Sequence, residues 1–288
     1  MKTICIKTNN ESIISYLLEK LENLNLKDVC FSCKNFKIFK NFFIHYNGQD
    51  FDLFLCDISD ILASIVLEFY EDVIAKNLIS NEYFYFNSTE KKDIFMKFVN
   101  IRNNDIECFS SKEKILFNIF YDFLNFSNKL FLKGFVTFRL NNYVKELQTQ
   151  IDSAVSQYLI EKEYNEFISL LKLYINTEPC QIEFVHLIYK DKIPILLDKD
   201  KNIIRVDSNI LNAKFLSDIS FSNSDIALNT LLNILPKKIY IHLIDKEVDE
   251  FITTIKLIFE NKAIICTDCN ICRIYSSKKK SEVFTPKL

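Results

Sequence analysis

KKIYIHLIDKEVDEFITTIKLIFENKAIICTDC, residues 237–269, is the stretch that decides the fold of the C-terminal part of this chain. Apolar residues alternate with polar ones in 237–243, recur at helical spacing in 246–261, and form a short run in 263–267. A strand, a helix of about 15 residues and a second strand make a βαβ element, in which the strands are parallel and the crossover is right-handed. The sequence therefore predicts a small α/β unit at this end of the chain.

The segments that precede this element extend the predicted unit. Residues 182–189 and 193–198 have the composition of two strands joined in a hairpin. Residues 222–235 have helical periodicity, and Pro236 is expected to end that helix because the residue before a proline is disfavoured in helical conformation. We therefore assign residues 179–288 to a C-terminal α/β unit.

The first two thirds of the chain have a different pattern. Residues 58–178 are predicted to be helical throughout, and the longest helix is expected over 141–177. In residues 1–57 we expect strands at 3–8, 29–36, 42–47 and 51–58, with a helix after the first of them. The predicted fold class is α+β, with a small N-terminal α/β unit (1–57), a helical middle with one long helix (58–178) and the C-terminal α/β unit (179–288).

The composition excludes several classes of protein. The 288 residues contain only two glycines, so neither a Walker phosphate loop nor a dinucleotide-binding fingerprint can be present. The formal net charge of −2 argues against a protein that coats nucleic acid, because that role needs a basic surface. Charges interrupt every apolar segment before about 18 residues, so we expect no membrane span. Nine cysteines at irregular spacing predict reduced thiols and a cytoplasmic location.

Cys266, Cys269 and Cys272 give the strongest chemical signal in the sequence. Two intervening residues allow successive thiolates to turn toward one ion, and this spacing is common in zinc and iron–sulfur sites. Three thiolates need a fourth ligand to complete a tetrahedral site. The spacing therefore favours a metal site. Redox chemistry and ordinary reduced cysteines in a terminal turn are the alternatives.

His242 is the predicted fourth ligand. The two strands of the βαβ element end at the same edge of the sheet, and His242 and Cys266 each lie near the end of their strand. His186 also lies on a predicted strand and is the second candidate for this role. The competing interpretation of each histidine is a hydrogen-bonded residue of the core.

Cys30 and Cys33 repeat the Cys-x-x-Cys spacing near the N-terminus. They lie on a predicted strand, where residues three apart point to opposite faces of the sheet. Both cysteines are therefore expected to be ordinary residues and not a chelating pair.

Several motifs follow one another along the chain. They are the Gly-Phe-x-x-Phe-Arg-Leu stretch at 134–140, the Glu-Lys-Glu-Tyr-x-Glu-Phe-Ile stretch at 161–168, Val185-His186, and PKKIYIH at 236–242, followed by the three cysteines. In this order the motifs resemble those of the YtxC-like family. The resemblance covers roughly residues 58 to 272. This sequence departs from the family in Asp268, where a glycine is common, so the cysteine loop is expected to be less tight.

The resemblance implies a process and no defined reaction, since the family is associated with sporulation in endospore-forming bacteria. We therefore expect a cytoplasmic, non-enzymatic sporulation protein that has a small thiolate metal site, with zinc as the metal and a protein partner in sporulation. One alternative is an iron–sulfur or redox enzyme that uses Cys266, Cys269 and Cys272 to hold its cluster. A second alternative is a nucleic-acid-binding regulator, which would need a basic face.

Overall fold

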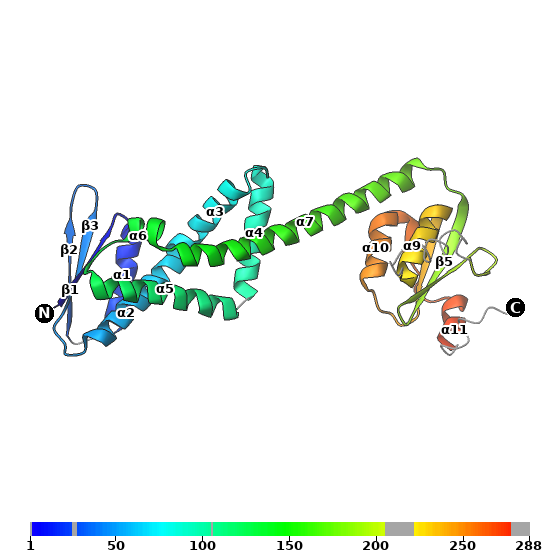
Figure 1. Cartoon of the computed structure of the whole chain (residues 1–288). Helices are drawn as coiled ribbons and strands as arrows, with labels where there is room; N and C mark the ends of the chain where they lie inside the picture. Colours follow the sequence, from blue (N-terminus) through cyan, green and yellow to red (C-terminus); the bar gives the residue numbers. More distant parts are fainter. Residues whose placement is uncertain (1, 25–27, 105, 205–221, 278–288) are drawn as a thin grey trace. The chain divides into compact units, whose positions relative to one another are not determined.

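The computed structural model describes residues 2–24, 28–104, 106–204 and 222–277. It confirms the α+β class, because two small mixed sheets combine with many helices (Figure 1). The chain forms two compact units, Met1–Glu161 and Lys162–Leu288, which we describe separately. The division into segments 1–57, 58–178 and 179–288 stays a prediction about domain organisation.

The N-terminal unit contains a four-stranded sheet. Its strands are β1 (Lys2–Thr8), β2 (Val29–Asn35), β3 (Lys40–Tyr46) and β4 (Lys129–Phe131), in the order β2-β3-β1-β4. The pairs β2–β3 and β3–β1 are antiparallel, whereas β4 is parallel to β1. Helix α1 (Glu11–Asn23) begins after Asn10, whose side chain accepts a hydrogen bond from the Ser12 amide. The first three predicted strands and the first helix are therefore confirmed.

The strand predicted over 51–58 is wrong, because these residues begin helix α2 (Phe51–Ile65). Phe54, Leu55 and Ile58 are buried, and only a helix brings residues with this spacing to one face. Ser59 and Asp60 lie inside α2 and not at its start. The Ser59 hydroxyl is buried and donates to the Leu55 carbonyl one turn earlier.

The remaining helices of the N-terminal unit share one hydrophobic core with α2 and the sheet. They are η1, a π-helical turn (Val66–Tyr70), α3 (Glu71–Glu82), α4 (Ser88–Asn104), α5 (Ile106–Phe126), α6 (Leu132–Arg139) and the first part of α7 (Asn141–Thr177). The prediction that 58–178 is helical throughout is wrong at β4, which pairs with β1 far away in sequence. The long helix predicted over 141–177 is confirmed.

The C-terminal unit contains a second four-stranded sheet. Its strands are β5 (Ile182–Lys190), β6 (Ile193–Leu197), β7 (Pro236–Leu243) and β8 (Ala263–Ile265), in the order β6-β5-β7-β8. The hairpin β5–β6 is antiparallel, whereas β5, β7 and β8 are parallel. Helix α9 (Asn223–Ile234) precedes β7, and α10 (Glu250–Phe259) connects β7 to β8. The predicted hairpin and βαβ element are confirmed.

Alternation along β5 and β7 gives this sheet two different faces. Leu187 and Ile241 join the core that contains α9, α10 and the second part of α7. Ile188 belongs to a smaller cluster with Ile271 of helix α11 (Asn270–Ser277), so α11 covers the opposite face. His242 follows Ile241 on β7 and therefore points to the face that α11 covers.

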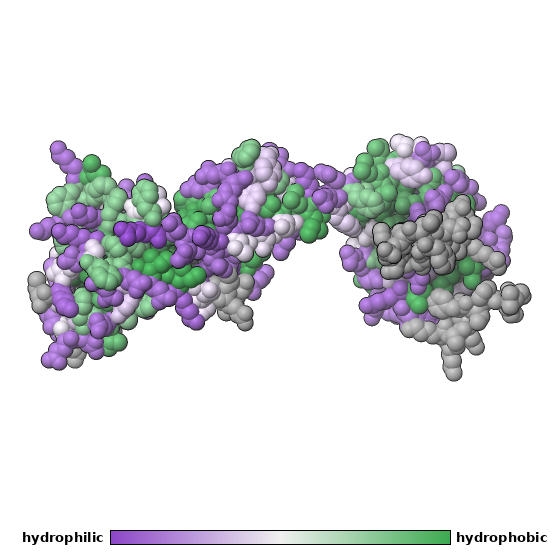
Figure 2. All heavy atoms as spheres, in the orientation of Figure 1, coloured by the Kyte–Doolittle hydropathy of each residue, from purple (hydrophilic) through white to green (hydrophobic). Residues whose placement is uncertain are grey.

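Both units expose apolar side chains among hydrophilic ones (Figure 2). Those on the second half of α7 include Ile160, Phe167, Leu170 and Leu173. Among the described residues, no helix combines the length and the apolar composition that crossing a membrane requires.

Candidate metal centre

The end of β8 brings Cys266 next to His242. Ile265 is opposite Ile241 in the parallel pairing of β8 with β7, and the Cys266 amide donates to the Ile241 carbonyl at 2.8 Å. Cys266 follows Ile265, and His242 follows Ile241. The two residues therefore lie next to each other on the same face of the sheet. The sequence predicted this proximity from the βαβ element alone.

The other two cysteines are carried by the start of α11. Cys269 directly precedes the helix, and the Arg273 amide donates to its carbonyl at 3.1 Å. Cys272 lies in the first turn. Across the loop, the Asp268 carboxylate accepts from the Arg273 guanidinium at 2.9 Å. Asp268 does not adopt a positive φ, so glycine's conformational freedom is not required at this position.

The donor atoms of these four residues converge. His242 Nδ1 lies 3.3 Å from Cys272 Sγ and 3.5 Å from Cys269 Sγ. Cys272 Sγ lies 3.8 Å from Cys269 Sγ and 3.9 Å from Cys266 Sγ. All four donor atoms are within 4.8 Å of one another, so the cluster could hold a metal ion.

These separations can be compared with those expected around zinc. Bonds of about 2.3 Å to sulfur and about 2.0 Å to nitrogen, at tetrahedral angles, separate two sulfurs by about 3.8 Å and a sulfur from a nitrogen by about 3.5 Å. The S–S distances of 3.8 and 3.9 Å and the N–S distances of 3.3 and 3.5 Å agree with these values. The sulfurs are too far apart for a disulfide, whose bond is about 2.05 Å long. The donor set therefore fits one tetrahedral ion.

Two of the three thiols have raised pKa values and one has a lowered pKa when no cation is present. Burial, together with hydrogen bonding and repulsion between the neighbouring thiols, raises the pKa of Cys266 to about 12. Burial also raises the pKa of Cys272. Burial acts to raise the pKa of Cys269 as well, but hydrogen bonds from the amides of Cys272 and Ile271 outweigh it and lower that pKa. A bound cation would stabilise all three thiolates.

His242 is in a state suited to metal binding. Its side chain is buried, and burial followed by repulsion from His186 lowers its pKa to about 4. The imidazole is therefore neutral at pH 7. A neutral ring has one nitrogen with a free lone pair, which is the form that coordinates metals.

His186 is adjacent to this cluster but does not join it. Its Nδ1 lies 3.0 Å from Nε2 of His242, on the side of that ring away from the cysteines. Burial, and then the charge of Lys201, lower the pKa of His186. The sequence offered His186 as a second candidate ligand, whereas the structure makes it a hydrogen-bond partner of His242. Their contact depends on the register of β5 against β7, which the sequence does not indicate.

Cys30 and Cys33 are both exposed on β2. Among the described residues, neither cysteine belongs to a group of three or more converging metal-binding donors. Their interpretation as ordinary cysteines stays a prediction.

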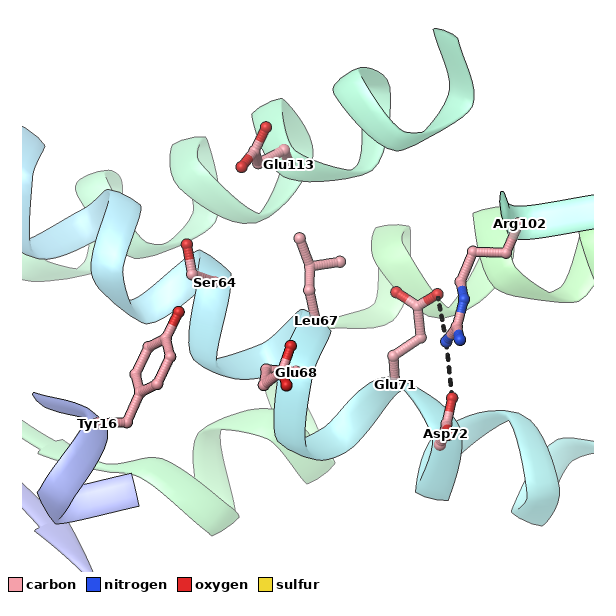
Figure 3. A pocket seen from close by; sticks show the side chains of 8 residues that line it. All are labelled: Tyr16, Ser64, Leu67, Glu68, Glu71, Asp72, Arg102 and Glu113. Carbon is pink, nitrogen blue, oxygen red and sulfur yellow. Dashed lines mark hydrogen bonds and ion pairs between the residues drawn. The ribbon is translucent and has the colours of Figure 1, made fainter. Parts of the chain in front are cut away.

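The N-terminal unit contains a second candidate site, a cavity of about 430 Å³ (Figure 3). It is lined by Tyr16, Ser64, Leu67, Glu68, Glu71, Asp72, Arg102 and Glu113. The buried Glu71 carboxylate accepts hydrogen bonds from Lys112, at 2.8 Å, and from the Tyr143 hydroxyl. Arg102 pairs with Asp72 at 2.7 Å. Residues of the unit itself bind the Glu71 carboxylate. The side of the cavity that contains Glu71 is therefore a structural ion-pair network.

Sequence reasoning missed this network. Its signal is the presence of Glu71 and Lys112 on the core-facing sides of α3 and α5, which are otherwise apolar. A charged residue on a buried helical face requires a partner, but the sequence does not indicate which residues pair.

Comparison with known proteins gives two matches. The family model described as "YtxC-like family" matches residues 57–264, so the match ends just before Cys266. The "Uncharacterized protein YtxC" of Bacillus subtilis (strain 168) is 27% identical over 136 residues, which are 45% of this chain and 48% of the relative. The alignment thus spans about half the length of that curated relative. No solved structure matches the chain.

Proposed function

Because the chain belongs to the YtxC-like family, we propose that it is a cytoplasmic, non-enzymatic protein of sporulation whose C-terminal unit is stabilised by one zinc ion. The family's association with endospore-forming bacteria supports the process. The observation that carries the zinc site is the convergence of His242 Nδ1 with the three cysteine sulfurs at the separations of a tetrahedral ion.

The proposed role of the ion is structural. A site with four protein donors leaves no open position for a substrate or a reactive water, which is typical of structural zinc. The donors come from β7, from the end of β8 and from α11, so the ion would cross-link three elements. Helix α11 is short and buries Ile271 as its main apolar contact with the sheet. Thiolate coordination would therefore supply much of the free energy that holds it there.

Two features support a single ion over an iron–sulfur cluster. In a [4Fe–4S] cluster each cysteine binds a different iron, so the cysteine sulfurs lie farther apart than the donors of one ion. In a [2Fe–2S] cluster no more than two cysteines share an iron, whereas here all three sulfurs lie within 4.8 Å of one another. Here the sulfurs of Cys272 and Cys269 are only 3.8 Å apart. A histidine completes the set, and it approaches these two sulfurs through Nδ1.

Metal identity can be determined on untagged protein purified without oxygen. We expect a colourless protein that contains stoichiometric zinc. A brown protein with visible absorption and bound iron would contradict the zinc proposal and favour the redox alternative.

A non-enzymatic protein must act by binding, and we propose a protein partner in sporulation. The exposed apolar residues of α7, such as Phe167 and Leu170, support this role because exposed apolar surface is typical of protein-binding sites.

Disruption of the gene tests the proposed process. In a spore-forming host, the disrupted strain should form fewer heat-resistant spores, or form them later, while its vegetative growth stays near normal. A complemented strain is the control. Equal heat-resistant spore counts in the disrupted and parent strains would count against a role in sporulation.

A further inference from the structure

His186 and His242 form a pair behind the proposed zinc site. They lie on the neighbouring parallel strands β5 and β7, in which His186 is opposite Tyr240 and His242 is opposite Ile188. The two histidines are therefore diagonal neighbours on the face that α11 covers. Their ring centroids are 5.1 Å apart, and His186 Nδ1 is 3.0 Å from His242 Nε2.

The ring of His186 is held in this orientation by aromatic neighbours. The Phe184 ring packs edge-on to it, with centroids 5.5 Å apart, and the Tyr240 ring lies 5.7 Å away. The position of His186 Nδ1 is thus determined by packing within the sheet as well as by its contact with His242.

Coordination chemistry determines the direction of the hydrogen bond between the two rings. A metal bound at His242 Nδ1 leaves that nitrogen without a proton, so the neutral ring has its proton on Nε2. Nε2–H must then donate, and His186 Nδ1 must accept. His186 is consequently neutral, with its own proton on Nε2.

From this geometry we propose that His186 is a positioning residue of the metal site, which holds His242 in the tautomer and orientation that present Nδ1 to the ion. This inference rests on the proposed metal site. Acceptors that bind the second nitrogen of a coordinating histidine raise its basicity, and their loss typically lowers metal affinity about 10–100-fold.

Two variants separate hydrogen bonding from packing. His186→Phe keeps an aromatic ring between Phe184 and Tyr240 but removes the acceptor, and we expect its zinc affinity to decrease about 10–100-fold. His186→Asn returns an acceptor oxygen near the position of Nδ1, and it should recover most of the lost affinity. Affinity is measured on the full chain by competition with a chromophoric zinc chelator.

Long-range proton–nitrogen NMR of the zinc-loaded parent protein tests the same inference without mutation. We expect the proton on Nε2 of both His242 and His186, with Nδ1 of His242 bound to the metal. Unchanged zinc affinity in His186→Phe, or a proton on Nδ1 of His186 in the zinc-loaded protein, would overturn the positioning role alone. A parent protein that binds no zinc would instead contradict the proposed metal site, and the positioning role with it.

Discussion

Glu71 and Lys112 pair in the interior of the N-terminal unit, where an unpaired charge would be strongly destabilising. Lys112 Nζ also donates to the Gln150 side-chain oxygen at 3.2 Å, and Tyr143 donates to the other oxygen of Glu71. Residues from α3, α5 and α7 therefore meet in one polar network within an apolar core. The network constrains how these helices can pack, because any shift would leave a buried polar atom without a partner.

Replacement of Lys112 by methionine should destabilise the N-terminal unit by about 3 kcal/mol, because it removes the nearest cation of the buried Glu71 carboxylate and leaves only Arg102, at 3.7 Å. The exposed Lys114 on the same helix gives a matched control, and Lys114→Met should change stability by less than about 0.5 kcal/mol. Urea denaturation of the full chain measures both variants. Equal unfolding midpoints for Lys112→Met and the parent would show that the pair does not stabilise this core.

At the scale of single residues, the four proposed ligands could be predicted from sequence, whereas their immediate partner could not. Cysteine spacing and the βαβ pattern together bring Cys266, Cys269, Cys272 and His242 to one edge of a sheet. The contact of His186 with His242 depends on the register of β5 against β7. Register between strands that are distant in sequence depends on packing across the whole sheet, which single-sequence periodicity does not report.

Helix α9 begins with a complete capping box. The Ser222 hydroxyl accepts from the Asp225 amide, and the Asp225 carboxylate accepts from the Ser222 amide at 2.9 Å. The helix then buries Ala227 and Leu231 against the sheet that carries His242. The cap thus determines where this supporting helix begins.

Removal of the cap by Ser222→Ala should lower the stability of the C-terminal unit by about 1 kcal/mol, because amides of the first turn lose an acceptor. Ser224→Ala is the control. Ser224 lies in the first turn of the same helix, and its replacement should have little effect. Urea denaturation followed by circular dichroism gives the comparison. A Ser222→Ala variant as stable as Ser224→Ala would indicate that solvent replaces the cap without cost.

Elements were predicted well where their periodicity is local and sustained, as in α7 and the β5–β6 hairpin. The misassigned segment 51–58 shows the limit of a short window, since eight apolar-rich residues fit a strand. Only a longer window, which includes Ile61 and Leu62, reveals the helical spacing of α2. Strand β4 has three residues and exists because β1 offers it a partner. No local pattern could predict it.

At the scale of the whole molecule, each of the two compact units has its own hydrophobic core, and the proposed ion lies within one of them. The stability of the N-terminal unit should therefore not depend on metal. Metal binding and local folding should instead be coupled around β8 and α11. Strand β8 leads into Cys266, and helix α11 begins directly after Cys269 and contains Cys272.

Removal of the metal by a chelator should increase amide hydrogen exchange in 263–277 and leave the exchange of helices α2 and α5 unchanged. Readdition of zinc should restore protection, which is the control for irreversible damage. Exchange is measured by mass spectrometry on the full chain. Unchanged protection in 263–277 after verified loss of zinc would show that the ion does not stabilise this segment.

The zinc content of Cys269→Ser, measured beside the parent protein and Cys180→Ser, tests the central claim most directly. Cys180 is exposed and lies outside the metal cluster, so it controls for nonspecific effects of losing a thiol. We predict about one zinc per chain in the parent and in Cys180→Ser, and a large loss of zinc in Cys269→Ser, because one of four ligands is removed. No zinc in the parent, or equal zinc in all three proteins, would contradict the assignment of these residues as a metal site.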